Sequence, residues 1–471
     1  MQKSAMRRRG WPICTAIAFS ALALGACSSA ATTGSTSGSE SVGTNSSSYR
    51  GGTAHLAASQ RPSYLVYWDQ NEEEDFVTST GIQGVLLPPW DINGQLCVLP
   101  DDSGRFVGGY DPTVPSQHNP GGVFPYKQPP IGEELDLPDG AFSGQTLYVP
   151  GPFKLPGETI GGDSPPTASG NFNSNSTYTG CVFDRHGDLL ASDIGTAQGQ
   201  FPPPDDGRLV EWFGPNYSQS CIVMGPTQGG AGPHHVDGTG GLSQPGMLTL
   251  ADNGDVLLPV AGTQQVLRLE ASSLPTSPSQ CPGGEYPAND LHTSVFFQGN
   301  GTTMPFPAGV AKDPTCDCIA ISSFFGNPSI IWVDQQGTPV PGRTGVPGET
   351  IAQLGQDPNG FNPFGMAFAP DGTLYFVDIH ITCKDNMLTN CGPANYGGRV
   401  MKVTFDNGVP STPTVVASGF DFPTSVTLCI PAQEDCPYPV GHFSLPHSGP
   451  SENPSPAIGP PSDRPATAGF G

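Results

Sequence analysis

The stretch NPFGMAFAPDGTLYF, residues Asn362–Phe376, decides the fold of this chain. Apolar residues recur at every second position on both sides of the pair Asp371-Gly372. An Asp-Gly pair supplies the positive-φ positions of a tight turn, and period-2 apolar patterns around it predict the two strands of a β-hairpin. Asp378 follows the second strand. The stretch therefore predicts a hairpin that opens with Pro-x-Gly and is followed by an aspartate.

Weaker copies of this stretch recur along the chain. They lie at Gly180–Asp193, Pro245–Val260 and Pro307–Ser322, and a degenerate start lies at Pro423–Cys429. The matching glycine or serine stands at positions 180, 246, 309, 365 and 425, so successive copies are 66, 63, 56 and 60 residues apart. A four-stranded propeller blade with long loops needs about this length, since repeats of roughly 40–50 residues mark the compact propellers. We predict an all-β fold, a six-bladed β-propeller with four-stranded blades.

Two N-terminal stretches complete the predicted ring. Ile92–Tyr110 has the same turn–strand–turn–strand form, and a sixth unit is expected around Leu137–Pro150, where the pattern is poorest. The short last copy predicts that an N-terminal strand completes the final blade, which removes exposed sheet edges. The propeller is predicted over residues 61–442. Five copies with a large insertion, or seven with two eroded, are the alternatives.

The N-terminus predicts an export signal. Residues 1–26 contain three consecutive arginines followed by an apolar stretch that is too short to span a membrane. Leu24-Gly25-Ala26-Cys27 has the form of a bacterial lipobox, which predicts a lipoprotein signal peptide with Cys27 as the lipidated first residue. An ordinary signal peptide that is cleaved near Ala26 or Ala30 is the alternative.

The segments that flank the propeller support the anchored form. Residues 27–60 form a flexible Ser/Thr/Gly tether, as a lipid anchor would need, and residues 443–471 form a disordered Pro/Ser-rich tail. We expect the protein at the bacterial cell envelope, extracytoplasmic and lipid-anchored to the membrane, at the outer membrane if the host has one.

The cysteines predict disulfides. Ten of the twelve remain when Cys14 and Cys27 are set aside, and an even number in an exported chain favours pairing. We predict the pairs Cys383–Cys391 and Cys429–Cys436, while the pairing of the other six stays open. Cys316 and Cys318 are expected to have separate partners, because two cysteines this close in an extended strand cannot bridge comfortably. A zinc site is the alternative, but no paired CxxC spacing supports it.

The charge of the chain limits its partners. There are 18 basic and 42 acidic residues, and this net charge of −24 excludes nucleic acid as a partner. The acidity serves either divalent cation binding or solubility outside the cytoplasm. We expect a monomer whose partner is a small-molecule substrate or an envelope protein.

The repeats resemble the NHL and regucalcin/gluconolactonase (SMP-30) group of propellers over about residues 177–430. This resemblance implies a catalytic metal at the mouth of the central channel, with an Asn and an Asp ligand placed just before the glycine that opens an inner strand. The matching positions here lack Asn, Asp and Glu, and a hard cation needs such oxygen ligands. These positions are Thr179, Pro245, Ala308, Phe364 and Thr424.

A second, more local resemblance is to the PQQ-dependent sugar dehydrogenases. Asn362-Pro363-Phe364-Gly365 and Asn395-Tyr396-Gly397 are similar to the NPxG and NYG stretches of that family, and Gly419–Ser425 resembles a blade start in related proteins. The arginine that usually precedes NPxG is replaced by Phe361. Basic residues that could neutralise the tricarboxylate cofactor are scarce nearby: Lys384, Arg399 and Lys402. PQQ is therefore a less favoured cofactor than a divalent metal such as Ca²⁺ or Zn²⁺.

Polar residues in loops are the candidates for chemistry. The loop GPHHVDG at 232–238 places His234, His235 and Asp237 together before the second clear copy, where a connection between blades reaches the channel mouth. Histidine is a common general base and metal ligand, so we predict these three as catalytic and metal-binding residues. Asp193 and Asp378 are expected to be structural, as acceptors of backbone hydrogen bonds in the following turn.

Two function classes follow from these features. The first is a metal-dependent, lactonase-like hydrolase that acts on a small sugar-derived or lactone substrate at the channel mouth. The second is a non-catalytic lipoprotein that presents the propeller as a binding platform at the envelope. A PQQ-dependent sugar dehydrogenase-like oxidoreductase is a further alternative.

Overall fold

A computed structural model describes residues 63–87, 178–193, 207–225 and 242–430, each with short gaps, together with the strands of one more sheet between residues 95 and 150. The predicted signal peptide, tether, Cys27 and tail lie outside the described residues. Within the described part of the chain, no helix is long and apolar enough to cross a membrane.

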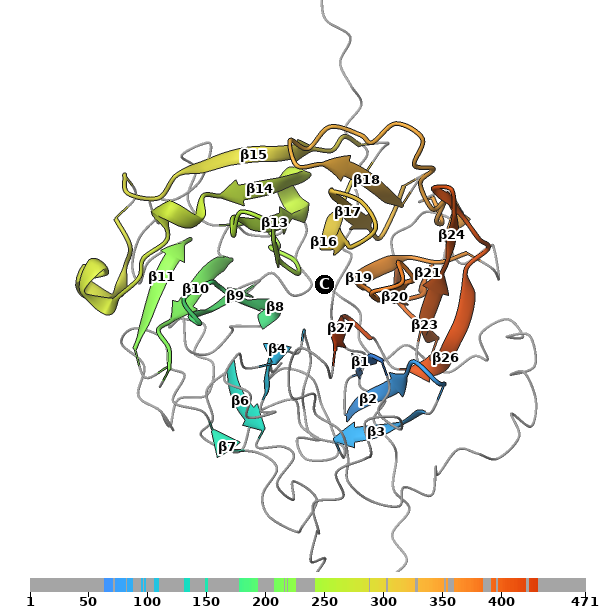
Figure 1. Cartoon of the computed structure of the whole chain (residues 1–471), viewed down its shortest axis with the longest axis horizontal. Coiled ribbons are helices and arrows are strands. Elements are labelled where there is room, and N and C mark those ends of the chain that lie inside the picture. Colours follow the sequence, from blue (N-terminus) through green and yellow to red (C-terminus); the bar gives the residue numbers. More distant parts are fainter. Residues whose placement is uncertain are drawn as a thin grey trace, which may run out of the picture.

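Six sheets stand around a common axis, which makes the fold an all-β propeller (Figure 1). The first sheet has the order β27-β1-β2-β3, with β1 (Leu65–Gln70), β2 (Glu73–Thr78), β3 (Gln83–Leu87) and β27 (Val426–Cys429). The second runs β4-β5-β6-β7, with β4 (Cys97–Val98), β5 (Phe106–Gly109), β6 (Ile131–Leu135) and β7 (Val149–Pro150). The third runs β11-β10-β9-β8, with β8 (Tyr178–Phe183), β9 (Leu189–Asp193), β10 (Arg208–Trp212) and β11 (Ser220–Met224).

The remaining three sheets follow in chain order. The fourth has β12 (Thr249–Leu250), β13 (Val256–Val260), β14 (Gln265–Leu269) and β15 (Thr293–Gln298). The fifth has β16 (Pro307–Asp313), β17 (Cys318–Ser323) and β18 (Ile330–Asp334). The sixth runs β19-β20-β23-β26, with β19 (Pro363–Phe368), β20 (Leu374–Asp378), β23 (Gly398–Val403) and β26 (Thr414–Phe420).

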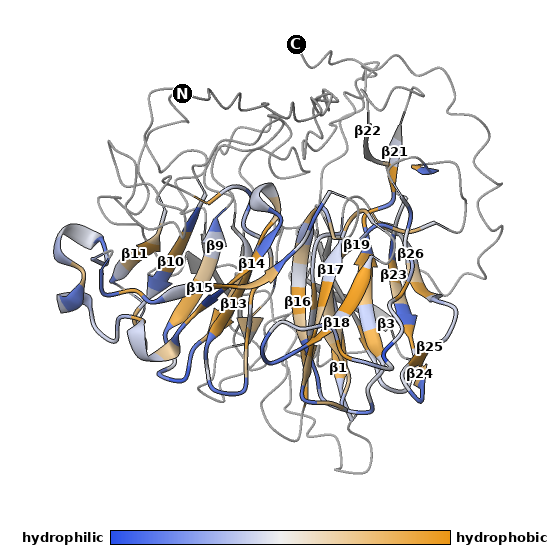
Figure 2. Cartoon of the chain, turned by 90° about the horizontal axis from the view of Figure 1, so that it is seen from above, coloured by the Kyte–Doolittle hydropathy of each residue, from blue (hydrophilic) through white to orange (hydrophobic). Residues whose placement is uncertain are grey.

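Short elements decorate this ring. Two small hairpins are β21 (Ile381–Cys383) with β22 (Cys391–Pro393), and β24 (Phe405–Asp406) with β25 (Val409–Pro410). Single 3-10 turns lie at η3 (Ala261–Thr263), η4 (Ala271–Ser273), η5 (Pro278–Gln280) and η6 (Pro282–Gly284). The β21–β22 hairpin projects beyond the blades on one face of the ring (Figure 2).

The ring closes as predicted, because the two ends of the fold share one sheet. β27 pairs with β1 in antiparallel register, with Leu65 opposite Cys429 and Trp68 opposite Val426. The blade count of six also agrees with the prediction, but two details differ. Ile92–Tyr110 and Leu137–Pro150 belong to one blade rather than two, and β4 and β7 have only two residues each, too few to show a period-2 pattern.

The fifth sheet has three strands among the described residues, where four were expected. Its outer edge makes two isolated bridges, Val333 with Pro339 and Ile330 with Val346. A proline cannot donate to a strand ladder, and the segment between these bridges also contains Pro341. The fourth strand is therefore reduced to single contacts.

The repeated glycine has a packing role that explains the Pro-x-Gly motif. A Cβ on Gly180 would lie 2.6 Å from Cα of Met247 in the next blade, and one on Gly246 would overlap the carbonyl oxygen of Ala308. The backbone N–H of Met247 donates to that same oxygen at 2.8 Å. Neighbouring inner strands thus approach so closely that only glycine fits between them.

Buried serines complete the contact between blades. The hydroxyl of Ser192, on the second strand of its blade, donates to the carbonyl oxygen of Gly246 at 2.7 Å. Ser322 does the same to Phe364 at 2.5 Å. Both serines are fully buried, so each hydroxyl satisfies a backbone group that water cannot reach. The strands are mostly hydrophobic and the turns mostly hydrophilic (Figure 2), and the buried apolar side chains of the strands form the core.

Candidate functional site

We call the side of the ring where the inner strands begin the mouth face, and the side where a tight turn joins the inner and second strands the hairpin face. Asp378 lies at the mouth face as the last residue of β20, opposite Pro363 and Arg399. Its side chain is fully buried, and Oδ1 accepts hydrogen bonds from the backbone N–H groups of Asn362 at 2.8 Å and His380 at 2.9 Å. These bonds agree with the structural role expected for this aspartate.

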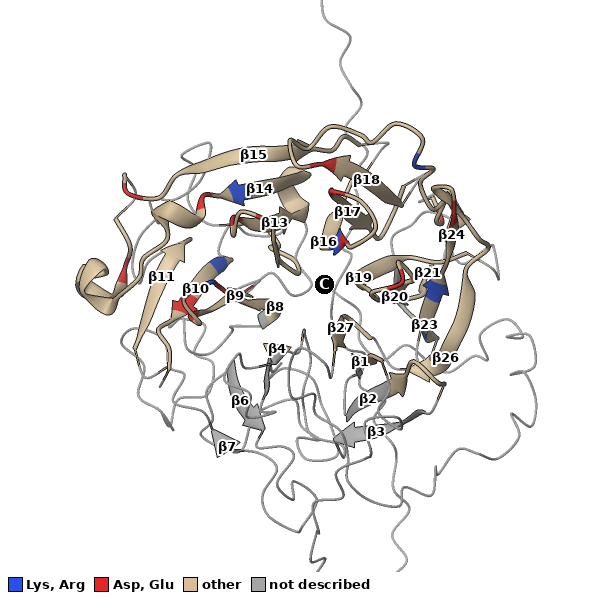
Figure 3. Ribbon diagram, viewed as in Figure 1, with Lys and Arg blue, Asp and Glu red and all other residues tan. Residues whose placement is uncertain are grey.

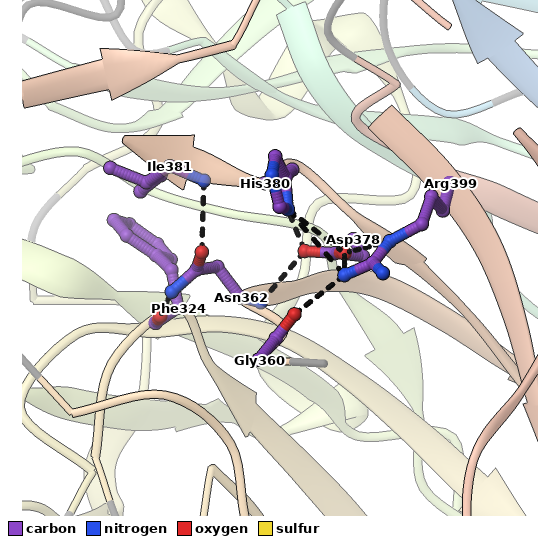
Figure 4. A network of polar contacts seen from close by, with 7 residues as sticks. All are labelled: Phe324, Gly360, Asn362, Asp378, His380, Ile381 and Arg399. Carbon is purple, nitrogen blue, oxygen red and sulfur yellow. Dashed lines mark hydrogen bonds and ion pairs between the residues drawn. The ribbon is translucent and has the colours of Figure 1, made fainter. Parts of the chain in front are cut away.

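Arg399 neutralises this carboxylate. Its Nε donates to Asp378 Oδ2 at 2.7 Å, and Nη2 donates to the same oxygen and to the carbonyl oxygen of Gly360 (Figure 4). The third blade repeats the arrangement at the same register position, where Arg208 Nε donates to Asp193 Oδ2 at 2.9 Å. Each pair joins the second strand of its blade to the third. In both blades the aspartate and the arginine therefore neutralise each other inside the fold.

His380 stands beside the Asp378–Arg399 pair at the base of the β21–β22 hairpin (Figure 4). Its backbone is left-handed, with φ 46°, which is uncommon outside glycine and points to a constrained position. Its side chain is 16% exposed. Nδ1 lies 3.5 Å from Arg399 Nη2. A guanidinium only donates, so this contact uses the lone pair of Nδ1 and leaves the proton of the neutral ring on Nε2.

Electrostatics keep this imidazole neutral. Burial lowers the pKa of His380 below that of an ordinary histidine, the nearby carboxylate of Asp378 opposes this effect, and Arg399 adds to it. The side chain therefore stays uncharged at neutral pH and presents an N–H donor. A neutral donor of this kind can polarise a carbonyl oxygen or protonate a leaving group.

Asn362 fixes the backbone on which this histidine stands. The Nδ2 group donates to the carbonyl oxygen of Phe324 at 3.0 Å, and Oδ1 accepts from the N–H of Ile381 at 2.9 Å (Figure 4). Gly397 lies against the His380 ring, since a Cβ there would be 2.9 Å from the ring carbon Cδ2. The NPFG and NYG stretches thus meet around His380, although Asn395 and Tyr396 lie outside the described residues.

The residues described at this place do not fit PQQ. Arg399 is bound to Asp378 and Gly360 rather than directed to a ligand. Lys402 is exposed and pairs with Tyr375 near the far end of its strand. Lys384 lies outside the described residues. No described cation at the site is therefore available for a tricarboxylate.

The positions that would hold a metal in the gluconolactonase family do not fit one here. The Thr179 hydroxyl donates to the carbonyl oxygen of Pro245 at 3.2 Å, and the carbonyl oxygen of Thr424 accepts from the N–H of Gly365 at 3.1 Å. Ala308 and Phe364 are buried hydrocarbon. These groups serve contacts between blades and offer no carboxylate to a cation.

Aromatic rings surround Phe364 instead. Phe324 lies 5.0 Å from it between ring centroids and stacks on Phe306 at 5.7 Å. Because Phe324 also receives the Asn362 hydrogen bond, this aromatic group adjoins the His380 network. Phe324 and Phe364 are buried and Phe306 is partly buried, so Phe306 is the member of this group that reaches the solvent near His380.

The predicted residues His234, His235 and Asp237 lie outside the described residues, so their grouping and their metal binding stay predictions. In the sequence, His380 stands two residues after Asp378 at the exit of a hairpin, and no motif marks it. The sequence signal that could have marked His380 as a candidate is its position between Asp378 and Arg399. Strand register is needed, however, to see that these three residues lie together.

The disulfides agree in part with the sequence. Cys97 pairs with Cys181 and Cys221 with Cys281. Cys383 and Cys391 stand opposite each other across the β21–β22 ladder, a position from which a bridge can form, although their side chains are not described. Cys429 is disulfide-bonded, and its expected partner Cys436 lies outside the described residues.

One expectation about the cysteines was wrong. Cys316 and Cys318 bond to each other rather than to separate partners. The expectation assumed an extended strand, whereas Cys316 lies in the tight turn that precedes β17. The turn brings the two Cα atoms to 5.2 Å, which is within reach of a bridge.

Two groups of residues have the composition of a metal site. In one, Asp313 lies near Cys316 and Cys318, but the disulfide removes both thiolates and the carboxylate is held by Trp332 Nε1 at 3.0 Å and by Arg343 at 3.3 Å. The other group consists of the buried carboxylates of Asp184, Asp188 and Glu211 on the hairpin face of the third blade.

Comparisons with known proteins return a similar fold and little sequence identity. No protein-family model matches the chain, and no curated protein matches it. The structure is similar to a luciferin-regenerating enzyme (TM-score 0.44, 14% identity, covering 77% of this chain and 91% of that one). It is similar to the calcium-binding protein regucalcin from Agrobacterium tumefaciens (0.38, 12%, 67% and 78%) and to a streptogramin B lyase (0.37, 12%, 76% and 79%). At these identities and TM-scores, the comparisons leave the activity undetermined.

Proposed function

We propose that this protein is an enzyme of the mouth face that hydrolyses a small lactone or sugar-derived substrate, with His380 as the hydrogen-bond donor to the reacting oxygen. The observation that supports this most is the neutral, largely buried imidazole that the Asp378–Arg399 pair holds in a left-handed backbone. A structure that only needed packing at this place would have no reason to keep a constrained polar ring there.

The proposed chemistry requires no metal at the family position. In lactone hydrolysis, water adds to the carbonyl carbon and the ring C–O bond then breaks, with one proton passing from the water to the leaving oxygen. The Nε2–H group of His380 would stabilise the negative charge that develops on an oxygen in this reaction. The partly buried ring of Phe306, which stacks on Phe324, would support the apolar side of the substrate. His234, His235 and Asp237 remain the proposed base and metal ligands of the loop at residues 232–238.

The test is turnover of a panel of five- and six-membered lactones, followed by acid release with the full-length protein. Asparagine is the replacement of choice for His380, because it tolerates a positive φ but is too short to reach the Nε2 position. We expect His380→Asn to lower kcat/KM by about 10²-fold or more, in line with the loss of one oxyanion donor. The matched control is His292→Asn, since His292 is exposed and pairs with Glu270 in another blade.

The pH profile supplies a second readout. Because the pKa of His380 is lowered, the neutral ring persists to a lower pH than in an ordinary histidine. Activity that depends on the neutral donor is therefore retained below about pH 6.5 and is lost only at more acidic pH. A profile that falls with a pKa at or above that value would contradict the assignment.

The second candidate is the non-catalytic binding platform, and the mouth positions favour it. Thr179, Pro245, Ala308, Phe364 and Thr424 carry no metal ligand side chain, and their backbone and hydroxyl groups serve contacts between blades. If no lactone in the panel is turned over and the His380→Asn protein behaves like the wild type, this candidate replaces the first.

The location of the protein is a separate proposal. We propose that it is a monomeric lipoprotein outside the cytoplasm, held by a lipid on Cys27. Labelling with a fatty-acid analogue tests this: the wild-type chain should take up the label, and Cys27→Ala should release the protein from membranes. An unlabelled wild-type chain would favour the ordinary signal peptide.

A further inference from the structure

Three carboxylates converge on the hairpin face of the third blade. Asp184 and Asp188 lie at the two ends of the turn between β8 and β9, and Glu211 lies on β10. One oxygen from each lies within 4.8 Å of the other two. Glu211 is fully buried, and the exposed fractions of Asp184 and Asp188 are 8% and 5%. Three acids thus share a space that water hardly reaches.

The backbone uses only part of the hydrogen-bonding capacity of this cluster. Asp184 Oδ1 accepts from the N–H groups of His186 at 2.8 Å and Asp188 at 2.9 Å, and Asp188 Oδ1 accepts from Gly214 at 2.6 Å. Both carboxylate oxygens of Glu211 are buried without any hydrogen-bond partner. Burying an ionised carboxylate without a partner costs free energy, so we expect a group that neutralises its charge.

No described lysine or arginine supplies that balance. Arg185 and His186 are the nearest basic residues in the chain, but both side chains are exposed and Arg185 Nε donates to His186 Nε2 at 3.2 Å. On the other side, Tyr286 packs near the cluster, and its pKa is raised by burial, then by Asp290 and by the charge of Glu211. Among the described residues, no lysine or arginine is paired with the three acids.

The next blade carries a base at the position of Glu211. There, Asp255 corresponds to Asp188, since its Oδ1 accepts from the N–H of Ala271 at 2.9 Å. The residue that corresponds to Glu211 by strand register is Arg268, whose Nε lies 3.6 Å from Asp255 Oδ2. In Figure 3 the end of β10 is accordingly red and that of β14 blue.

The sixth blade also carries a base at this register position, because Lys402 stands opposite Tyr375 as Glu211 stands opposite Leu190. The third blade therefore has an acid where the fourth and sixth blades have a base, and it has the aspartate that the base faces in the fourth blade. An acid in place of a base removes one positive charge and adds one negative charge, and a bound cation restores the balance.

We propose that Asp184, Asp188 and Glu211 bind a calcium ion that stabilises the third blade. The three oxygens lie within 4.8 Å of one another, and two oxygen ligands of one calcium ion can be about 4.6–5.2 Å apart, so a single ion can reach all three. Magnesium loses its water shell reluctantly and usually binds through one or two carboxylates, so a buried group of three carboxylates suits calcium better. Water and backbone carbonyls would complete the coordination. The site is remote from the mouth face and independent of the function proposed there.

Protonation is the competing way to balance the cluster. Burial, followed by the charges of Asp184 and Asp188, raises the pKa of Glu211 well above that of an ordinary glutamate. Burial also raises the pKa of Asp188, where the Gly214 N–H opposes the shift. A protein that relies on protons alone would be indifferent to calcium, so the two arrangements can be separated by experiment.

The test measures calcium binding to the full-length protein after removal of metals with EDTA. We expect calorimetry at about pH 7.5 to show binding, and CaCl₂ at about a hundred times the Kd to raise the Tm by roughly 3–5 °C over EDTA, with a smaller rise in MgCl₂. Glu211→Gln keeps the shape of the side chain and should abolish the rise.

A matched control distinguishes the loss of the aspartate's turn hydrogen bonds from the loss of a calcium ligand. Asp334 makes the same turn, with Oδ1 accepting from Gln336 at 2.9 Å and Thr338 at 2.8 Å, but it belongs to no acidic cluster. We expect Asp184→Asn to lose the calcium response and Asp334→Asn to keep it. The double variant His234→Ala/His235→Ala should also keep it, which separates this site from the predicted loop site.

Melting each variant in EDTA shows whether it folds, so a folding defect appears as a lower metal-free Tm and not as a lost response. A wild-type protein that neither binds nor responds to calcium would overturn the proposal. A Glu211→Gln protein that responds like the wild type would overturn it equally.

Discussion

Replacing Asp378 by asparagine tests how the mouth network is held together. The asparagine can still accept the backbone N–H groups of Asn362 and His380, but its amide would face the Arg399 guanidinium donor to donor. Two charge-assisted hydrogen bonds are lost, each worth about 1.5–3 kcal/mol, and the arginine is left mostly buried without a counter-ion. The expected loss of about 3–5 kcal/mol agrees with the usual cost of breaking a buried ion pair.

Urea denaturation measures this change. We expect a lower midpoint with an unchanged m-value, because the surface exposed on unfolding stays the same. The matched variant Asp193→Asn breaks the equivalent pair with Arg208, which is almost fully buried on both sides, and should cost as much or more. Only Asp378→Asn should also impair turnover, since only that pair holds His380. A loss below about 1 kcal/mol, typical of an exposed pair, would refute the reasoning.

Three further changes have defined outcomes. Gly246→Ala should destabilise the protein by about 1–3 kcal/mol, because its Cβ overlaps Ala308, whereas Gly301→Ala, which has open space, should be nearly neutral in the same urea titration. In EDTA, Glu211→Gln should be more stable than the wild type at about pH 7.5 and equal to it near pH 4. The reason is that the pKa of Glu211 is raised in the folded protein, so the wild type loses stability as the pH rises above the unfolded pKa of about 4.3. A wild-type protein that gains stability over this range relative to the variant would contradict the raised pKa. Thiol titration of the denatured, unreduced protein should find no free cysteine, and several reactive thiols would contradict the pairing of all ten.

The sequence predicts the architecture well because each repeat needs the same residue types for its tight turn and for its contact with the next blade. The glycine that lets inner strands approach each other recurs at 180, 246, 309 and 365, and a positive-φ glycine recurs in the turn at 187, 254 and 372. Blades without these signals were misassigned. The strands of the second blade include two of only two residues, which no periodic pattern can show.

The candidate site was predictable only in part, because it is made by register. Asp378, His380 and Arg399 are separated by 21 residues at most and belong to two strands and a connection. The same holds for Glu211, which meets Asp184 and Asp188 only because β10 pairs with β9 so that Glu211 lies opposite Leu190. Sequence spacing alone places it among ordinary strand residues. The histidine-rich loop was visible from spacing because its members are adjacent.

A repeat protein contains its own reference, since equivalent positions in different blades perform the same structural task. Asp193 and Asp378 both neutralise an arginine at one register position, and a change there would affect structure first. Departures from the repeat have a different meaning. The sixth blade adds a constrained histidine beside its ion pair, and the third blade exchanges the basic residue of its neighbour for Glu211. Neither departure improves packing, and each leaves a polar group that a ligand could satisfy. We therefore expect ligand binding at these two departures and not at the positions that the blades share.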